Sequence, residues 1–487
     1  MAPFGCACAC DRRTACCTGI RAPTSAQWRM HKSPSHLARA SVSFIEILGH
    51  TLANIVPSAM ATVTISLVAA QGGPLTQLVY LVVGGAMLLV AAQVAVLARE
   101  VPAAGSLFVS VGHSLHPLAG LLSGWAMMGG YLGALVGAPI VGGLFVAKAL
   151  HVEGFSLPWP WVALAFAGIA WALTIRDVGL ATRYSLLIEV ISLVVIVAIG
   201  LITLARTGWH DLAQWHGHVA PSTFLRAMTL SILAYGGFET AANFGREGRH
   251  PTRDVPRAIL VAVLVCIVFY VFMATIEMAG FKGDAALLAK TEAPLSALAV
   301  REGLPVLAIM SDMAMAIAAL SATIATLNSL GRLLYSMGRH HVLPRALGKI
   351  GRHRTPAAAL HVLGGFTVAF VAFVGFFAIS PLSIIDLFGV FTALGFIVIY
   401  LLAMVAVLVL RRRRGRKPSA SIVFGFVTAV PLLLVVLAEN FWGARGLPLV
   451  AAYGFLVYMA AGAGLYAVWR RRFPGPLADF GVLRDDD

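Results

Sequence analysis

One acidic residue stands inside a long apolar stretch of the sequence. Glu189 lies in SLLIEVISLVVIVAIG, a run that contains no basic residue. A charged group in such a setting is costly to keep, so its default interpretation is functional. A buried carboxylate can load and release a proton, because burial disfavours its charged form. The alternative is a carboxylate that only pairs with a backbone or hydroxyl donor for packing.

Two other apolar runs contain residues that break helices. The stretch GHTLANIVPSAM from Gly49 carries Pro57, and AYGGFET from Ala234 carries Gly236 and Gly237. Proline removes a backbone donor and clashes with the preceding turn, and backbone groups freed inside a membrane must line a protein or water cavity. This pattern favours a binding site between two broken helices that face each other. Simple kinks, which are common in membrane helices, are the alternative.

The composition indicates whether these segments lie in water or in a membrane. Of 487 residues, 59% are hydrophobic and 12% are charged, against roughly 45–50% and about 25% in soluble proteins. Lys and Arg exceed Asp and Glu by 36 to 21, which would suit a nucleic-acid partner. The mean hydropathy of +0.87 argues against that partner. We expect an all-α polytopic membrane protein that is surrounded by lipid and binds no nucleic acid.

Twelve apolar runs are long enough to cross a bilayer as helices, which takes about 20 residues each. None shows the alternation of a membrane barrel. Their approximate limits are 43–70, 75–98, 118–148, 159–175, 184–205, 222–245, 257–280, 305–334, 357–378, 382–410, 419–438 and 448–469.

The basic residues predict the orientation of these helices. With the N terminus inside, 29 of the 36 Lys and Arg residues fall on the cytoplasmic side and 7 outside. Positive charge accumulates on the cytoplasmic side of membrane proteins. We therefore expect both termini in the cytoplasm and the protein in the plasma or inner membrane.

The first forty residues predict a disordered cytoplasmic tail, or an over-extended gene start with Met30 as the initiator. Five of the six cysteines lie there, but they lack the paired CxxC units of a zinc module. No metal site is expected. These cysteines are Cys6, Cys8, Cys10, Cys16 and Cys17.

Three sequence blocks resemble the amino acid–polyamine–organocation permeases. AYGGFETAANFGREGRHPTRDVPRAI from Ala234 resembles the sixth helix and the following loop of that family. REVPAAGSLFVSVGHSLHPLAGLLSGWAMMGGY from Arg99 and NSLGRLLYSMGRHHVLPRALGKIGRHRTP from Asn328 resemble its second-to-third-helix and eighth-helix regions. Together the resemblance covers roughly residues 40–470.

The resemblance implies a leucine-transporter-type fold, with two inverted five-helix repeats and discontinuous helices 1 and 6. The expected units are a tail at 1–40, a first repeat at 41–205, a second repeat at 222–410, two additional helices at 411–470 and a C-terminal tail at 471–487.

In such a fold the substrate's carboxylate meets a half-helix N terminus, which favours anions, and its ammonium meets freed carbonyl groups. His50, Asn54 and Pro57 stand where many members have a glycine-rich pattern, which leaves the substrate open. The implied substrate-binding residues are Ala53, Asn54, Ile55, Val56, Tyr235, Gly236, Gly237 and Phe238. For Tyr235, a packing role is the alternative.

The resemblance also implies coupling and gating residues. Glu189 aligns with a fifth-helix position where many proton-coupled members carry a lysine, which makes it the candidate coupling group. Glu239 matches the family's Gly-Phe-Glu carboxylate and is expected to help gating. Glu46 and His50 lie one turn apart, close enough to interact. His50 is a candidate for tuning the pocket, and the alternative is that the two side chains only satisfy each other.

We therefore expect a secondary transporter for an amino acid or related amine, working by alternating access. The expected drive is the proton gradient through symport, with sodium as the alternative ion and no cofactor. An amine, polyamine or amino-acid exchanger and a non-transporting nutrient sensor are the alternatives. An enzyme is not expected, since HExxH, GxSxG and P-loop patterns do not occur.

Overall fold

Helices make up nearly all the regular structure of the computed structural model. It describes residues 42–101, 106–152, 155–176, 178–207, 217–245, 248–340, 342–351 and 355–472. The expected tail at 1–40, with its cysteines, and residues 473–487 of the expected C-terminal tail lie outside the described residues. One isolated bridge joins Val42 to Gly248, where the Arg249 N–H donates to the Val42 carbonyl at 2.9 Å.

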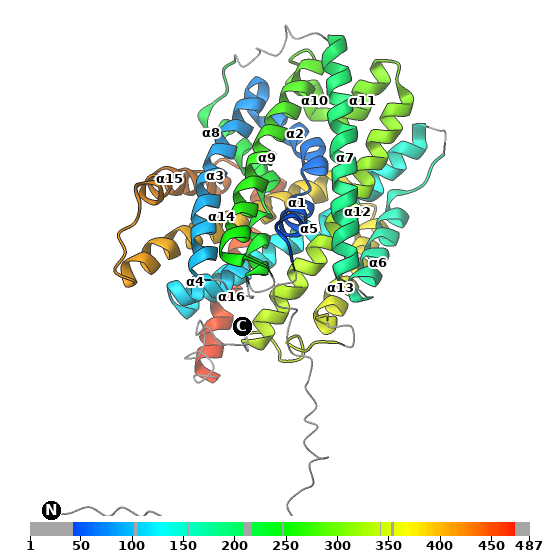
Figure 1. Ribbon diagram of the computed structural model, residues 1–487. Helices are drawn as coiled ribbons and strands as arrows, with labels where there is room; N and C mark the ends of the chain where they lie inside the picture. The colour runs from blue at the N-terminus through cyan, green and yellow to red at the C-terminus, as the bar shows by residue number, and fades with distance from the viewer. Residues whose placement is uncertain are drawn as a thin grey trace, which may run out of the picture. The chain divides into compact units, whose positions relative to one another are not determined.

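The first half of the described chain runs from α1 to α7 (Figure 1). Its first apolar run is divided into two helices rather than one. The helices are α1 (Phe44–Ile55), α2 (Pro57–Gly72), η1 (Gly73–Leu75), α3 (Thr76–Glu100), α4 (Ser106–Ser114), α5 (Pro117–Val152), α6 (Trp159–Arg176) and α7 (Val178–Thr207).

The second half begins with another divided run and continues to α16. Proline stands in the first turn of several of these helices, where its missing N–H costs nothing. The helices are α8 (Pro221–Tyr235), η3 (Phe238–Phe244), α9 (Pro251–Gly280), α10 (Ala285–Lys290), α11 (Pro294–Arg301), α12 (Pro305–Arg339), α13 (Ala357–Phe376), α14 (Pro381–Arg413), α15 (Ala420–Trp442) and α16 (Leu447–Arg472).

Ten helical stretches among the described residues are long and apolar enough to cross a membrane. One of them, Phe44–Glu100, has 57 residues, about 85 Å of helix and far more than one bilayer needs. It contains two of the twelve runs expected from the sequence. The sixth run is absent from the ten because α8 has only 15 residues before its break. The count of twelve spans stays a prediction.

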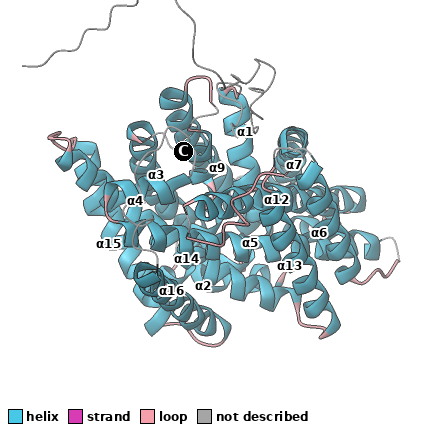
Figure 2. Cartoon of the chain, turned by 90° about the horizontal axis from the view of Figure 1, so that it is seen from below, coloured by secondary structure: helices cyan, strands magenta, loops and turns pink. Residues whose placement is uncertain are grey.

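Close packing joins helices that are distant in sequence. α5 packs along α12 and α14, and α3 packs along α9. Figure 2 shows α5 and α12 towards the middle of the described helices, with α6 on one side and α15 on the other. Small residues permit this approach: a Cβ on Gly395 of α14 would lie 2.7 Å from the Ala126 carbonyl oxygen of α5.

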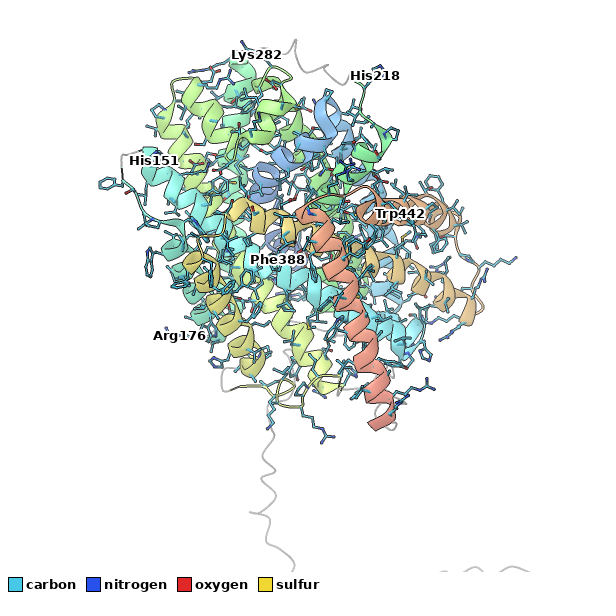
Figure 3. The ribbon with its side chains drawn as sticks, turned by 180° about the vertical axis from the view of Figure 1, so that it is seen from behind. His151, Arg176, His218, Lys282, Phe388 and Trp442 are labelled. Carbon is cyan, nitrogen blue, oxygen red and sulfur yellow. The ribbon has the colours of Figure 1, made fainter. Side chains whose placement is uncertain are left out.

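The outer faces of peripheral helices are apolar. Phe424 and Val427 of α15 and Val457 of α16 are all more than 60% exposed, as suits side chains that face lipid. Figure 3 places Lys282 at the upper edge of the helices and Arg176 at the lower edge. In the sequence-based sorting of the basic residues, Arg176 is one of the 29 on the cytoplasmic side and Lys282 is one of the 7 outside. Which face is cytoplasmic stays a prediction.

Candidate functional site

The first run breaks at the position that the sequence predicts. α1 ends at Ile55, and Pro57 begins α2. Val56 between them has φ 51° and ψ 57°, a left-handed conformation that is unusual for a β-branched residue. Its N–H still bonds the Leu52 carbonyl at 2.8 Å. The first N–H groups of α2 have no partner within the helix, and Ser58 is the first residue able to donate one.

The second break lies at the predicted glycine pair. α8 ends at Tyr235, Gly236 is extended, and Gly237 has φ 113°, a conformation that glycine adopts far more readily than other residues. The chain then forms the short 3₁₀ helix η3. A Cβ on Gly237 would lie 3.1 Å from the backbone carbonyl of Asn54 and from the nitrogen of Ile55. The two breaks are therefore in backbone contact.

Asn54 ties the first break to α12. Its Nδ2 lies 3.0 Å from the His50 carbonyl oxygen and 3.1 Å from His50 Nε2. Ser329 Oγ of α12 donates to Asn54 Oδ1 at 2.9 Å. The ring of His50 meets Phe244 of η3 edge-on at 5.0 Å, and the Arg332 guanidinium lies 5.3 Å from the centre of the same Phe244 ring.

Glu189 reaches the start of α2 from α7. Its Oε1 accepts the Ser58 N–H at 3.1 Å, and the side chain is only 1% exposed. Its Oε2 has no hydrogen-bond partner, and neither has Ser58 Oγ. A carboxylate at a helix N terminus is stabilised by the free N–H groups and the helix dipole. The structure thus places Glu189 at the first break, bonded to a backbone donor as the packing alternative expects, and its coupling role stays a prediction.

Glu239 is held on both oxygens at the second break. Tyr131 of α5 donates its hydroxyl to Oε1 at 2.6 Å, and Tyr400 of α14 donates to Oε2 at 2.9 Å. The Gly237 N–H also donates to Oε2, at 3.1 Å. Glu239 is fully buried. The three hydrogen bonds join the second break to α5 and α14 and leave neither carboxylate oxygen without a donor.

The aromatic residues at the second break point in different directions. Phe238 stacks on Tyr400 with ring centres 4.9 Å apart. Tyr235 instead donates its hydroxyl to the Tyr80 carbonyl of α3 at 2.9 Å and meets Tyr270 of α9 edge-on at 5.1 Å. Its hydroxyl is therefore engaged in packing between helices, the alternative that the sequence left open. Ala53 and Ile55 are likewise buried.

Several residues of this region were not found from the sequence. Ser58, Tyr131, Ser329 and Tyr400 supply the partners described above, yet each lies in a different span from the group it bonds. Tyr400 follows Phe396 by one turn of α14, and Phe396 contacts Gly236. That aromatic pair is the only local signal among them.

Two other acidic groups are buried away from the breaks. Glu277 is fully buried in α9, three residues before the end of that helix, and neither carboxylate oxygen has a hydrogen-bond partner. Asp312 of α12 accepts the Ser296 hydroxyl at 2.8 Å. A surface hollow of about 510 Å³ beside Lys148, His151 and Glu292 also lies elsewhere, because His151 is 20 residues beyond Tyr131 on α5, about 30 Å along that helix.

The chain matches a model of the amino acid permease family over residues 50–466. The chain belongs to this family. The branched-chain amino acid permease BcaP of Lactococcus lactis is 25% identical to it, over 77% of this chain and 83% of the relative. The methylthioribose transporter of Bacillus subtilis is 24% identical over 90% of this chain and 94% of the relative.

A third relative, the D-serine/D-alanine/glycine transporter of Escherichia coli K12, is 24% identical over 63% of this chain and 67% of its own length. The family and these relatives are transporters. The chain is therefore a multi-pass membrane permease and not an enzyme, as the sequence predicted.

Proposed function

We propose that this permease is a secondary active transporter that moves an amino acid or related amine across the plasma membrane by alternating access. The observation that carries the proposal is the backbone contact between the two breaks, where Gly237 lies against Asn54 and Ile55. Broken helices expose backbone donors and acceptors in mid-membrane, where they can bind a polar substrate.

The proposed substrate site comprises both breaks. Carbonyl groups at the end of α1 and at Gly236 would accept the substrate's N–H groups, beside the start of α2, where Glu189 holds the Ser58 N–H. Side chains beside the breaks would then contact the rest of the substrate. The proposed binding residues are Ala53, Asn54, Ile55, Val56, Tyr235, Gly236, Gly237 and Phe238, of which Tyr235 would act through its backbone because its hydroxyl bonds α3.

The names of the relatives support a small polar substrate without fixing its side chain. BcaP is named for branched-chain amino acids, and the third relative for D-serine, D-alanine and glycine. The methylthioribose transporter is named for a molecule with neither an amino nor a carboxyl group. Recognition through the backbone suits such variety, because backbone groups at a helix break can bind a polar moiety whatever side chains surround them.

We further propose that the proton gradient drives transport through Glu189, with Glu239 and His50 acting in gating. Glu189 supports this role by its burial and its single hydrogen bond to the Ser58 N–H. A proton arriving on Glu189 would weaken that bond to α2, so protonation and the geometry of the first break would be linked. We propose twelve spans in two inverted five-helix repeats, with both termini in the cytoplasm.

Counterflow in proteoliposomes tests this proposal. Vesicles loaded with one unlabelled amino acid or amine at a time are diluted into trace labelled substrate, with and without a pH gradient. Saturable, transient accumulation of at least one compound is expected. Protein-free vesicles control for leak. Absence of saturable uptake across the panel would overturn the proposed function.

A further inference from the structure

The buried residues that ordinarily carry a full charge are acidic in the described part of this permease. Among the residues that the structure describes, the buried acidic residues are Glu189, Glu239, Glu277 and Asp312, and no Lys or Arg residue is buried. The side chain of Glu100, 7% exposed, is paired with Arg411 and Arg414 near the surface. A buried charge needs a partner of opposite sign or a full set of hydrogen bonds, because leaving water costs it its hydration. Each buried carboxylate therefore raises the question of what satisfies it.

The two carboxylates at the breaks differ in how many hydrogen bonds they accept. Glu239 receives two tyrosine hydroxyls and one backbone N–H, so both its oxygens are bonded. Glu189 receives only the Ser58 N–H on Oε1. Its Oε2 meets no donor within hydrogen-bond distance, and the Ser58 hydroxyl beside the carboxylate bonds no residue other than Glu189. Of the two carboxylates at the breaks, only Glu189 keeps an oxygen without a donor.

Glu189 and Ser58 together have the chemistry of an ammonium site. A primary ammonium presents three N–H donors and one positive charge, and a carboxylate oxygen beside a hydroxyl oxygen can accept two of them. Charge-assisted bonds of this kind are about twice as strong as neutral ones. The α2 N terminus, where a substrate carboxylate would bind, is already occupied by the Glu189 carboxylate.

We propose that Glu189 and Ser58 bind the ammonium group of the substrate, and that the preferred substrate is an amine that lacks a carboxylate. The inference rests on the proposed function and narrows its substrate class. An amino acid would bring a second carboxylate to an N terminus that already holds one, and the two anions repel each other in a medium of low dielectric constant. A cationic amine supplies the charge that Glu189 lacks.

A consequence concerns coupling. The proton and the ammonium are alternative occupants of one carboxylate, so binding of one displaces the other. Such competition produces exchange of amine for proton, rather than the symport expected from the sequence.

Other ionisable groups surround Glu189 on the helices that contact α7, which are α1, α2, α6, α9, α11 and α12. Their buried ionisable side chains are His50, Cys266, Tyr270, Glu277 and Asp312.

Matched ligand pairs test the proposal on the purified full-length protein. Isothermal titration calorimetry would compare leucine with 3-methylbutylamine, valine with isobutylamine and serine with ethanolamine. The amine of at least one pair should bind about tenfold or more tightly than its amino acid, since repulsion between the substrate's carboxylate and Glu189 in a medium of low dielectric constant costs at least that much. Titrations in buffers of different ionisation enthalpy should show proton release on amine binding at pH values where Glu189 is protonated.

Variants then assign the effect to Glu189. Glu189→Gln should weaken amine binding about tenfold or more, abolish proton release and leave amino-acid binding unchanged or tighter. Glu277→Gln removes another buried carboxylate and should leave the preference intact. Ser58→Ala keeps the backbone N–H and should weaken amine binding several-fold, which preserves the test if Glu189→Gln fails to fold.

The outcomes separate this inference from the proposed function. Tighter binding of the amino acid than the amine in every pair, or equal losses for both ligands in Glu189→Gln, would overturn the inference alone. Loss of the preference in Glu277→Gln would overturn the assignment to Glu189. Failure of all three amines to bind, while counterflow finds a substrate elsewhere in the panel, would also overturn the inference alone. Only the absence of saturable uptake across the whole panel would overturn the proposed function as well.

Discussion

Substitution of Gly237 by alanine tests the contact between the two breaks. The residue has φ 113°, where a side chain is strained by about 1–3 kcal/mol. The added Cβ would also lie 3.1 Å from the carbonyl group of Asn54 and the nitrogen of Ile55, and these backbone atoms cannot rotate away as a flexible side chain can. Strain of that size lowers the population of the native break about 5- to 150-fold.

Two assays measure this effect. Counterflow uptake by Gly237→Ala should fall at least fivefold, and the melting temperature of the detergent-purified protein should decrease. Gly85→Ala is the matched control: Gly85 is exposed in α3, and a Cβ there has no atom within 4 Å, so alanine should preserve both quantities or raise stability slightly. Wild-type uptake and melting temperature in Gly237→Ala would refute a close contact between the breaks.

Three further substitutions probe the polar groups. Glu189→Gln should leave uptake that no longer responds to a pH gradient in proteoliposomes, and full gradient-driven accumulation would contradict its coupling role. Tyr131→Phe and Tyr400→Phe each remove one hydroxyl donor from the buried Glu239 carboxylate. Each should reduce the free energy of unfolding by about 1–3 kcal/mol and so lower the melting temperature. An unchanged melting temperature in both variants would argue against this network. Ser329→Ala removes one hydrogen-bond donor to Asn54 and should reduce the free energy of unfolding by about 1 kcal/mol. Its uptake should fall less than that of Gly237→Ala.

The positions of the breaks could be predicted because helix breaking is local. Pro57 lacks the N–H that a continuous helix needs, and Gly236-Gly237 weakens the sixth run at its centre. The conformation of Val56 could not be predicted in the same way. A left-handed valine is intrinsically unfavourable, so only the surrounding packing can impose it. The packing includes Gly237, which is 181 positions further along the chain.

The direction in which a side chain points was the second feature that could not be predicted from the sequence. The sequence placed Tyr235 next to the break, which is correct for its backbone, but it could not show that the hydroxyl bonds Tyr80 of α3. Glu277 shows the same limit: the sequence places it near the end of an apolar run, and only the neighbouring helices show that its side chain is fully buried. Both outcomes depend on which helices lie alongside, and that is a property of the assembled bundle.

The difference between Glu189 and Glu239 shows why such partners decide function. From the sequence, both are acidic residues in apolar surroundings, and both invite a functional hypothesis. Glu239 is bonded by Tyr131 and Tyr400, from 108 and 161 positions away, so its burial is explained by the protein itself. Glu189 has one bond from Ser58, 131 positions away, and an oxygen without a partner. A carboxylate with its bonds complete holds helices together, whereas one with capacity left over can bind a proton or an ammonium, and that distinction makes Glu189 the stronger candidate for transport chemistry.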